Sequence, residues 1–489
     1  MTDNPTVLIA GAGPVGLTLA NELARQGISV RIVDRNAERT DKSKALVMWG
    51  RTLELFDDAG YATEFLRAGV PAHGAQISTG KEIVASVAFD SSDSRFNYAL
   101  MIPQSETERV LEQRLAAAGV KVERRVELAD FADKGASVEA VLRKADGSSE
   151  TLSADWLVGC DGAHSAVRHG LGFTFEGSML ESHWALADGY LTGLAPADRL
   201  HIFWHRDGIL AFFPIVGDRW RVIADLGPAT NDEKHPDPTL EEINALMARR
   251  GSPGIAMRDP FWLAAFRINE RKVRDYRKGR VFLAGDAAHI HSPAGGQGMN
   301  TGMQDAFNLA WKLALVIGRA ARPALLDSYS PERSAVGEVV LRNAGRLTEA
   351  ATLRNPIAQG LRNTIVKFAT GFPALQHRIA NQLSEMDIAY PDSPLSVAGA
   401  YSVDEPAAGA RWPDRLPPGA GGAKFTAVGP ADAVAALTAR YPKLVLAAPV
   451  TGAHADALRL IRPDGYVGFA GTASDRVKAD AYLGALAAG

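Results

Sequence analysis

The sequence predicts an α/β protein of more than one domain, on three observations. A short apolar run from Thr6 to Ala10 precedes a glycine-rich turn and a helical stretch, which is typical of a strand–turn–helix unit in a parallel sheet. Two later segments, 156–168 and 279–314, repeat the order of apolar strand, glycine–aspartate loop and helix. Between them, short strand-like runs over 178–265 are joined by two-residue turns and predict an antiparallel sheet.

Length and composition set the class of protein. At 489 residues the chain exceeds one ordinary domain, and 46% hydrophobic against 22% charged residues indicates folded cores. The 53 basic and 56 acidic residues give no basic excess, so neither nucleic acid nor a membrane is expected as a partner. The single cysteine, Cys160, and the absence of a signal-like basic start or a long apolar span predict a cytoplasmic protein.

The first unit carries the spacing of a dinucleotide-binding turn. Gly11, Gly13 and Gly16 allow a tight turn, a close backbone approach to a pyrophosphate, and packing of the helix on the strand. The N–H groups at the helix start attract the phosphates. A second strand, Ser29–Val33, ends at Asp34, which is placed to accept hydrogen bonds from ribose hydroxyls. This unit predicts dinucleotide binding and leaves NAD and FAD open.

The two later segments favour FAD. Asp161 follows an apolar strand, and Asp286 follows the strand 281–284, where an aspartate can bind polyol hydroxyls. Gly295, Gly296 and Gly298 then leave backbone amides bare before a helix. A glycine-rich helix start stabilises a delocalised anion such as a reduced flavin.

Together the three segments resemble the group A flavoprotein monooxygenases, the FAD-dependent aromatic hydroxylases of the para-hydroxybenzoate hydroxylase and phenol hydroxylase type, and among them the bacterial polyketide hydroxylases. The resemblance implies a Rossmann-like FAD-binding domain of the GR2 type, an inserted antiparallel-sheet substrate domain and a C-terminal thioredoxin-like domain. The implied FAD-binding domain has a first part, 1–177, of which 73–97 is contributed to the substrate domain, and a second part, 266–395, which includes a helical segment. The implied substrate domain is 178–265, and the implied thioredoxin-like domain is 396–489. Without cysteine, the last domain has no redox role.

The resemblance also implies roles for single residues. Gly11, Gly13 and Gly16 would bind the FAD pyrophosphate, Asp34 the adenosine ribose and Asp286 the ribityl chain. Asp161 would serve FAD and NAD(P)H, and the amides of Gly298, Met299 and Asn300 would face the flavin pyrimidine. Two positions depart from the family: Asp34 replaces the usual Glu, and Lys44 replaces a cofactor-contacting Arg. The implied cofactor-binding set is Gly11, Gly13, Pro14, Val15, Gly16, Asp34, Arg35, Lys44, Gln104, Asp161, Gly285, Asp286, Pro293, Gly298, Met299 and Asn300.

Alternation along the strand-like runs predicts a substrate-facing wall. Turns at Asp207-Gly208 and Gly217-Asp218 would pair Trp204 with Ala211 and Phe213 with Val222. The resulting apolar face could line the substrate pocket, or it could be the core of this domain; both interpretations stay open. An apolar wall with only Arg206 at its edge favours an apolar aromatic substrate over a small benzoate. The predicted wall is Ile202, Trp204, Phe213, Ile215, Trp220 and Val222.

The resulting hypothesis is an NAD(P)H-dependent FAD monooxygenase that uses O2 to hydroxylate a phenolic or polycyclic aromatic substrate, through the flavin C4a-hydroperoxide that the resemblance implies. Candidate catalytic residues are Pro293, Arg206, Tyr190 and His73. The alternatives are a Baeyer–Villiger oxygenase acting on a polyketide and a non-catalytic FAD-binding protein. No metal is expected, because His289 and His291 have no third ligand nearby in sequence. A homodimer is one assembly that the sequence leaves open.

Overall fold

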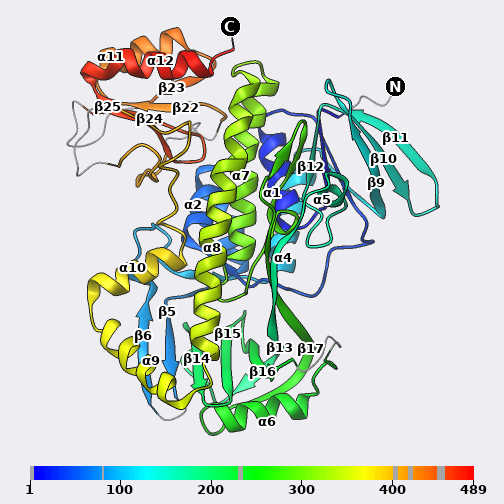
Figure 1. Ribbon diagram of the computed structural model, residues 1–489, viewed down its shortest axis with the longest axis vertical. Coiled ribbons are helices and arrows are strands. Elements are labelled where there is room, and N and C mark those ends of the chain that lie inside the picture. The colour runs from blue at the N-terminus through cyan, green and yellow to red at the C-terminus, as the bar shows by residue number, and fades with distance from the viewer. Residues whose placement is uncertain are drawn as a thin grey trace.

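The computed structural model describes residues 5–79, 82–229, 235–399, 406–416, 422–448 and 457–488. It is a mixed α/β fold, as predicted (Figure 1). A six-stranded sheet holds the N-terminal unit, and its neighbouring strands run parallel except at the β18 edge. In spatial order its strands are β18 (Arg277–Lys278), β19 (Val281–Leu283), β12 (Trp156–Gly159), β1 (Val7–Ala10), β2 (Val30–Asp34) and β8 (Val122–Arg124).

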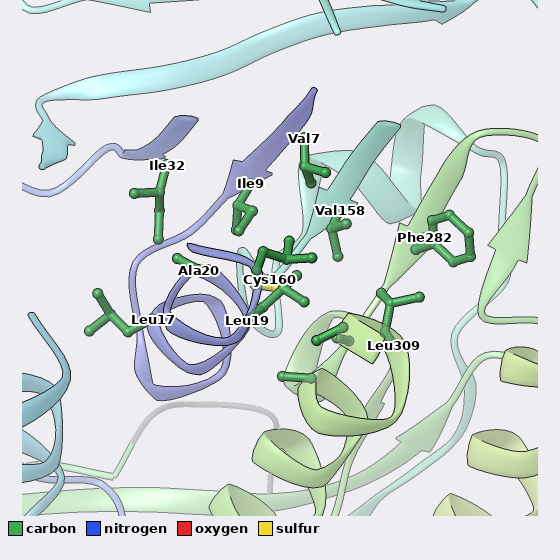
Figure 2. Close-up of a cluster of buried hydrophobic side chains, with 14 of the residues drawn as sticks. Val7, Ile9, Leu17, Leu19, Ala20, Ile32, Val158, Cys160, Phe282 and Leu309 are labelled. Carbon is green, nitrogen blue, oxygen red and sulfur yellow. The ribbon is translucent and has the colours of Figure 1, made fainter. Parts of the chain in front are cut away.

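Helices α1 (Pro14–Arg25) and α7 (Gly298–Ile317) pack on each other beside this sheet. Leu17 and Leu19 of α1 belong to one cluster of buried side chains with Ile9, Val158 and Leu309 from β1, β12 and α7 (Figure 2). All five side chains are fully buried, so the N-terminal unit and α7 share one hydrophobic core. The other elements of this part are α2 (Gly50–Asp58), α3 (Ala62–Ala68), α4 (Gln104–Ala117), α5 (Ala166–Gly170), α8 (Tyr329–Thr352), β3 (Val47–Met48), β4 (Val70–Ala72), β7 (Ala99–Met101), β9 (Val126–Asp133), β10 (Val138–Lys144) and β11 (Ser149–Ala154).

An eight-stranded sheet contains the predicted antiparallel segment. All its neighbouring strands are antiparallel except β14 and β5, and the strands β5 and β6 come from a much earlier part of the chain. Helix α6 (Leu240–Arg250) covers one face with the buried Ile243 and Met247. In spatial order the strands are β20 (His289–Ile290), β17 (Ala256–Lys272), β13 (Glu176–Thr192), β16 (Arg219–Pro228), β15 (Gly208–Pro214), β14 (Arg199–His205), β5 (Gly74–Ser78) and β6 (Ile83–Ala88).

The first hairpin of this sheet is displaced from its predicted position without changing which side chains share a face. Its turn residues are Arg206 and Asp207 instead of Asp207 and Gly208, so Trp204 lies opposite Ile209. The pairing moves by two residues, and because side chains alternate with a period of two, Ile202, Trp204 and Phe213 keep a common face.

The second hairpin overturns part of the predicted wall. Its loop has three residues, with Gly217 at φ +71°, so Ile215 faces Arg219, and Phe213 lies opposite Arg221. This one-residue slip moves Trp220 and Val222 to the other face. The prediction that these two residues share a face with Phe213 and Ile215 was wrong: they are 4% and 1% exposed, in the core beneath α6.

A five-stranded sheet forms the C-terminal part. Arg462, in the loop after β24, donates to both oxygens of Glu332 on α8 at 2.7 and 2.9 Å and is fully buried. Lys312 of α7 donates to the same carboxylate at 2.7 Å. A buried charge needs such partners, so this sheet is fastened to α7 and α8. Its elements are β21 (Val397–Ala398), β25 (Val467–Thr472), β24 (Ala457–Ile461), β22 (Phe425–Val428), β23 (Val445–Ala447), α11 (Ala431–Arg440) and α12 (Arg476–Leu486).

Two helices, α9 (Pro356–Ala369) and α10 (Pro373–Leu383), connect α8 to the C-terminal part along the outer side of β6 (Figure 1). Within the described ranges, no helix combines the length and apolar character needed to cross a bilayer.

Candidate active site

The three glycine–aspartate loops lie side by side. Strands β1, β12 and β19 end at the same edge of the sheet, with Ala10 beside Gly159 and Gly159 beside Leu283. The Cys160 amide donates to the Ala10 carbonyl at 2.7 Å, and the Ala284 amide donates to the Gly159 carbonyl at 3.0 Å. The predicted convergence of these loops is therefore present, at the strand ends where open α/β sheets bind ligands.

The glycines of the first loop serve different needs. Gly11 has φ +102°, and a Cβ there would lie 2.3 Å from the Cys160 carbonyl oxygen. A Cβ on Gly16 would lie 2.0 Å from the Gly11 oxygen, so both positions require glycine for packing. At Gly13 a Cβ would meet nothing within 4 Å. Gly13 is therefore not needed by the protein's own packing, and the open space beside it fits a group that approaches from outside.

Asp34 closes this loop from the end of β2. Its carboxylate accepts from the Ala12 amide at 2.8 Å and from the Asn36 amide at 2.8 Å. Arg124 lies 3.8 Å away. Asp34 thus holds the glycine loop in shape while keeping acceptor capacity for a further donor.

Asp161 has an unused acceptor at the second loop. Its Oδ2 accepts from the Ala166 and Val167 amides at 2.7 and 3.2 Å, which caps α5. Its Oδ1 is buried and has no hydrogen-bond partner among the described residues. Burial raises the pKa of Asp161, partly offset by hydrogen bonds. A buried acceptor of this kind fits a ligand hydroxyl or amine.

The third loop leads into the first turn of α7. The amides of Gly298, Met299 and Asn300 are first-turn groups, which have no partner within the helix. The Asn300 side chain fixes the loop, because it accepts from the Trp49 amide at 2.8 Å and donates to the Val47 and Gly296 carbonyls at 2.9 Å. The positive end of a 20-residue helix is thus held rigidly.

Asp286 lies at the start of this loop, in a short 3-10 turn, Gly285–Ala287. The residue is exposed, yet the surrounding protein raises its pKa, and His289 and Lys44 offset part of that effect. Lys44 is exposed and supplies positive charge near Asp286.

The remaining predicted cofactor residues border the same loops. Val15 packs at both Gly285 and Gly302, where an added Cβ would lie 2.7 Å from its Cγ2. Gln104 accepts from the Ala45 amide at 3.2 Å and so fixes the segment beside Lys44. Pro14 starts α1, Pro293 is exposed in the third loop, and Arg35 is exposed after Asp34. Their roles toward FAD stay predictions.

A buried ion cluster supports the third loop, and nothing in the sequence pattern had indicated it. Asp305 on α7 accepts from the Gly285 amide at 2.9 Å, from His289 Nε2 at 2.8 Å and from Arg333 Nε at 2.6 Å. Arg333 also donates to the Thr301 carbonyl at 2.9 Å. Burial would raise the pKa of Asp305, but Arg333 and His289 outweigh it and hold that pKa below its usual range. Among the described residues, no group of three or more His, Cys, Asp or Glu could hold a metal ion.

The face of the eight-stranded sheet opposite α6 borders these loops. Phe213 and Ile215 pack with Val47 and Trp49, and Trp49 Nε1 donates to the Gly295 carbonyl at 2.8 Å. Ile202, Trp204, Phe213 and Ile223 are half-buried, whereas the residues that alternate with them lie in the α6 core. Of the predicted wall, Ile202, Trp204, Phe213 and Ile215 share this face, together with Ile223. That this face lines a substrate pocket stays a prediction.

A charged pair, also missed in the sequence, lies on this face. Arg221 and Asp188 are buried and joined by two hydrogen bonds of 2.8 and 2.7 Å. Arg221 also lies 3.4 Å from the Lys44 carbonyl oxygen. This face therefore carries a second cation besides Arg206, and the Asp188 carboxylate pairs with it.

The structure does not bring the other predicted catalytic residues together. Arg206 lies in the β14–β15 turn with its side chain 81% exposed. Tyr190 lies at the opposite end of the sheet, under Arg258 at 5.0 Å. His73 is exposed beside Tyr98, with ring centroids 5.9 Å apart. A catalytic role for Arg206, Tyr190 or His73 stays a prediction.

Comparison with known proteins decides the family. Residues 4–344 match the family model described as "FAD binding domain". The chain is 40% identical over 418 residues to 6-methylpretetramide 4-monooxygenase of Streptomyces rimosus, covering 83% of this chain and 73% of the relative. The chain belongs to the FAD-dependent monooxygenases. It is also 34% identical to a flavin-dependent monooxygenase of Mycobacteroides abscessus, over 95% of this chain and 96% of the relative.

Solved structures of this monooxygenase family have the same fold. CabE, an aromatic hydroxylase from angucycline biosynthesis, superimposes with a TM-score of 0.81 at 29% identity, covering 99% of this chain and 100% of CabE. The protein is thus an FAD-dependent enzyme. The loops fit this cofactor, because the space beside Gly13, the unpaired Asp161 oxygen and the first turn of α7 lie along one sheet edge.

One buried acid beside α7 should make stability depend on pH. Glu385 accepts from Thr301 Oγ1 at 2.7 Å and from Gln304 Nε2 at 2.6 Å, and burial raises its pKa to about 8. The folded protein therefore holds a proton that the unfolded chain has lost above its ordinary pKa. Stability is expected to fall by about 1.4 kcal/mol per pH unit as the pH rises toward that value.

Replacing this acid tests the effect. The free energy of unfolding is measured by urea titration at pH 6 and pH 8. It should fall less between these two pH values in Glu385→Gln than in the wild type. Equal slopes in the variant and the wild type would show that Glu385 does not hold that proton.

Proposed function

We propose that this monooxygenase hydroxylates a largely apolar phenolic or polycyclic aromatic substrate, with NAD(P)H and O2 as co-substrates. The observation that carries the proposal is the position of the half-buried face of Ile202, Phe213 and Ile223 beside the loops that fit FAD. Bound FAD would supply the redox chemistry, by taking electrons from NAD(P)H and activating O2. Relatives named for tetracycline-type and chlorophenol substrates support an aromatic substrate class.

The chain's own part in this reaction is to hold the cofactor, orient the substrate and exclude water. Gly13 would leave room for the FAD pyrophosphate, and the first turn of α7 would bind the edge of the flavin. The parts of FAD that carry hydroxyl groups would be bound by Asp34, Asp161 and Asp286. The apolar wall would orient the ring and keep water away. Arg221, held in place by Asp188, would offer a guanidinium N–H donor to an ionised substrate oxygen, although the pair carries no net charge. We also propose the domain boundaries given above, the thioredoxin-like assignment and a cytoplasmic location.

Activity tests the proposal directly. Purified protein loaded with FAD should oxidise NAD(P)H faster when a suitable phenol or polycyclic phenol is added, and hydroxylated product should form in step with the NAD(P)H consumed. A ketone substrate converted to an ester would favour the Baeyer–Villiger alternative. No response to any aromatic from a fully loaded protein would favour the non-catalytic alternative.

Two neighbouring residues on β16 test the wall. Ile223 is half-buried on the proposed substrate face, and Val222 is 1% exposed beneath α6. Ile223→Ala should raise KM for the aromatic substrate about tenfold with little loss of stability. Val222→Ala should instead lower the free energy of unfolding by about 1–3 kcal/mol and leave KM unchanged. The opposite assignment of effects would mean that the other face of the sheet binds the substrate.

A further inference from the structure

Helix α9 is an amphipathic helix whose apolar side faces outward. Its inward side carries polar groups: Arg362 donates to the Ala350 carbonyl at 2.8 Å and lies 3.9 Å from the Trp204 ring centroid. Gln359 donates to the Leu353 carbonyl at 2.6 Å. A surface helix normally buries its apolar side, so α9 reverses the usual arrangement.

The outward side forms a continuous apolar stripe, which we call the α9 stripe. Its residues follow one another at intervals of four, four, three and four, which places those within the helix on one face. Figure 1 shows α9 at the outer edge of the molecule, beyond β5 and β6. Elsewhere in the described ranges, large exposed apolar side chains occur singly or in pairs. The stripe is Ile357 (84% exposed), Leu361 (61%), Ile365 (56%), Phe368 (71%) and Phe372 (50%).

Exposed apolar groups gathered in one stripe indicate an interaction surface. The charge of the chain segment that carries this stripe indicates which partner fits. Between Glu349 and Glu385 the sequence has four cations, Arg354, Arg362, Lys367 and Arg378, and no Asp or Glu. The chain as a whole is slightly acidic, so the average charge conceals this local basic stretch.

The cations differ in how firmly they are held. Arg354 pairs with the buried Asp225 at 2.9 Å, and Arg362 is buried against α8. Lys367 pairs with Glu82 at 3.1 Å, but both side chains are more than 60% exposed, so this pair is weak and can be exchanged for another anion. Arg378 is exposed on α10. Lys367, on the helix that carries the stripe, therefore remains available, and Arg378 adds an exposed cation on the next helix, where its charge offsets part of the rise in the Asp387 pKa.

From these observations we infer that the α9 stripe docks the protein on the surface of an anionic phospholipid bilayer. Aliphatic and phenylalanine side chains insert at the boundary between headgroups and acyl chains, and flanking Lys and Arg bind lipid phosphates. A symmetric pairing of two copies through the stripe fits less well, because it would bring the same acid-free stretch against itself. This mode of binding requires no helix that spans the membrane.

Membrane docking at α9 goes beyond the proposed function, but its link to the substrate wall rests on that function. Arg362 joins α9 to Trp204, which shares a face with Ile202 and Phe213 of the proposed substrate wall. Apolar polycyclic compounds accumulate in bilayers, so docking at α9 would bring the substrate wall close to their source. Vesicle binding is measured without turnover, so its failure is distinct from failure of the proposed function.

Vesicle flotation of the FAD-loaded full chain tests the inference. Protein should float about tenfold more with phosphatidylcholine vesicles containing about 30% phosphatidylglycerol than with phosphatidylcholine alone, and about 0.5 M salt should reduce this binding. Ile365→Gln/Phe368→Ser should abolish flotation, and Lys367→Gln/Arg378→Gln should weaken it about tenfold. The matched control is Val477→Ser, which removes a 75% exposed apolar side chain from α12 and should float like the wild type.

Several results would overturn the inference. The inference would be overturned if the wild-type protein stayed monomeric and floated with neither kind of vesicle. It would also be overturned if the Ile365→Gln/Phe368→Ser variant floated as well as the wild type. Self-association that this variant abolishes, without vesicle binding, would show that a second copy covers the stripe. All variants change exposed residues, and unchanged thermal unfolding and FAD content would show that they fold normally.

Discussion

Gly13→Ala is expected to yield a folded protein that no longer retains FAD. A Cβ at this position meets no protein atom within 4 Å, so the folded chain accepts it without strain. The methyl group would instead occupy the space where the backbone must approach the pyrophosphate. We expect an unchanged free energy of unfolding for the apoprotein and a loss of FAD affinity of about a hundredfold or more, measured by flavin fluorescence titration.

Gly11→Ala provides the contrast. Its Cβ would lie 2.3 Å from the Cys160 carbonyl oxygen, on a backbone at φ +102°, so this variant should destabilise the apoprotein itself by about 3 kcal/mol or more. Gly360→Ala, inside α9 with nothing within 4 Å, is the control and should preserve FAD affinity while raising the free energy of unfolding by up to about 1 kcal/mol. If Gly13→Ala retained FAD normally, the β1–α1 loop would not be the pyrophosphate site.

A large loss of both stability and FAD affinity is also expected when Asp305 is replaced. Asp305→Asn keeps the size of the side chain but removes the negative charge that Arg333 and His289 share. Arg333 would then remain fully buried without a carboxylate, at a cost of about 3–5 kcal/mol. Because Asp305 also accepts from the Gly285 amide, the third loop should loosen and FAD affinity should fall with stability.

Guanidinium unfolding of the apoprotein and FAD titration measure these two losses. Asp327→Asn is the matched control, since Asp327 is 72% exposed and its pair with Arg277 should contribute less than about 1 kcal/mol. A variant Asp305→Asn as stable as Asp327→Asn would contradict the view that the ion cluster supports the third loop.

Local signals were enough to predict much of the cofactor region. The spacing of Gly11, Gly13 and Gly16, with Asp34 at the end of β2, predicts a strand–turn–helix loop because each position answers to local backbone geometry. The convergence of the three loops then follows from the parallel order of β1, β12 and β19, whose ends meet at one edge.

The sheet and its charged groups were harder to predict, for two physical reasons. A hairpin loop with three residues instead of two, allowed by the left-handed Gly217, is enough to move Trp220 and Val222 to the other face. Ion pairs such as Asp188 with Arg221, and Asp305 with Arg333, join residues about thirty positions apart, on different strands or helices. No local pattern reveals such partners, because only tertiary packing brings them together.

The FAD content of the purified protein tests the central claim most directly. After loading with excess FAD and removal of free flavin, denatured protein should release one FAD per chain, and FMN should not substitute for it because the glycine loop binds the pyrophosphate that FMN lacks. A folded chain that releases no flavin after this treatment would contradict the assignment of the three loops as a cofactor site.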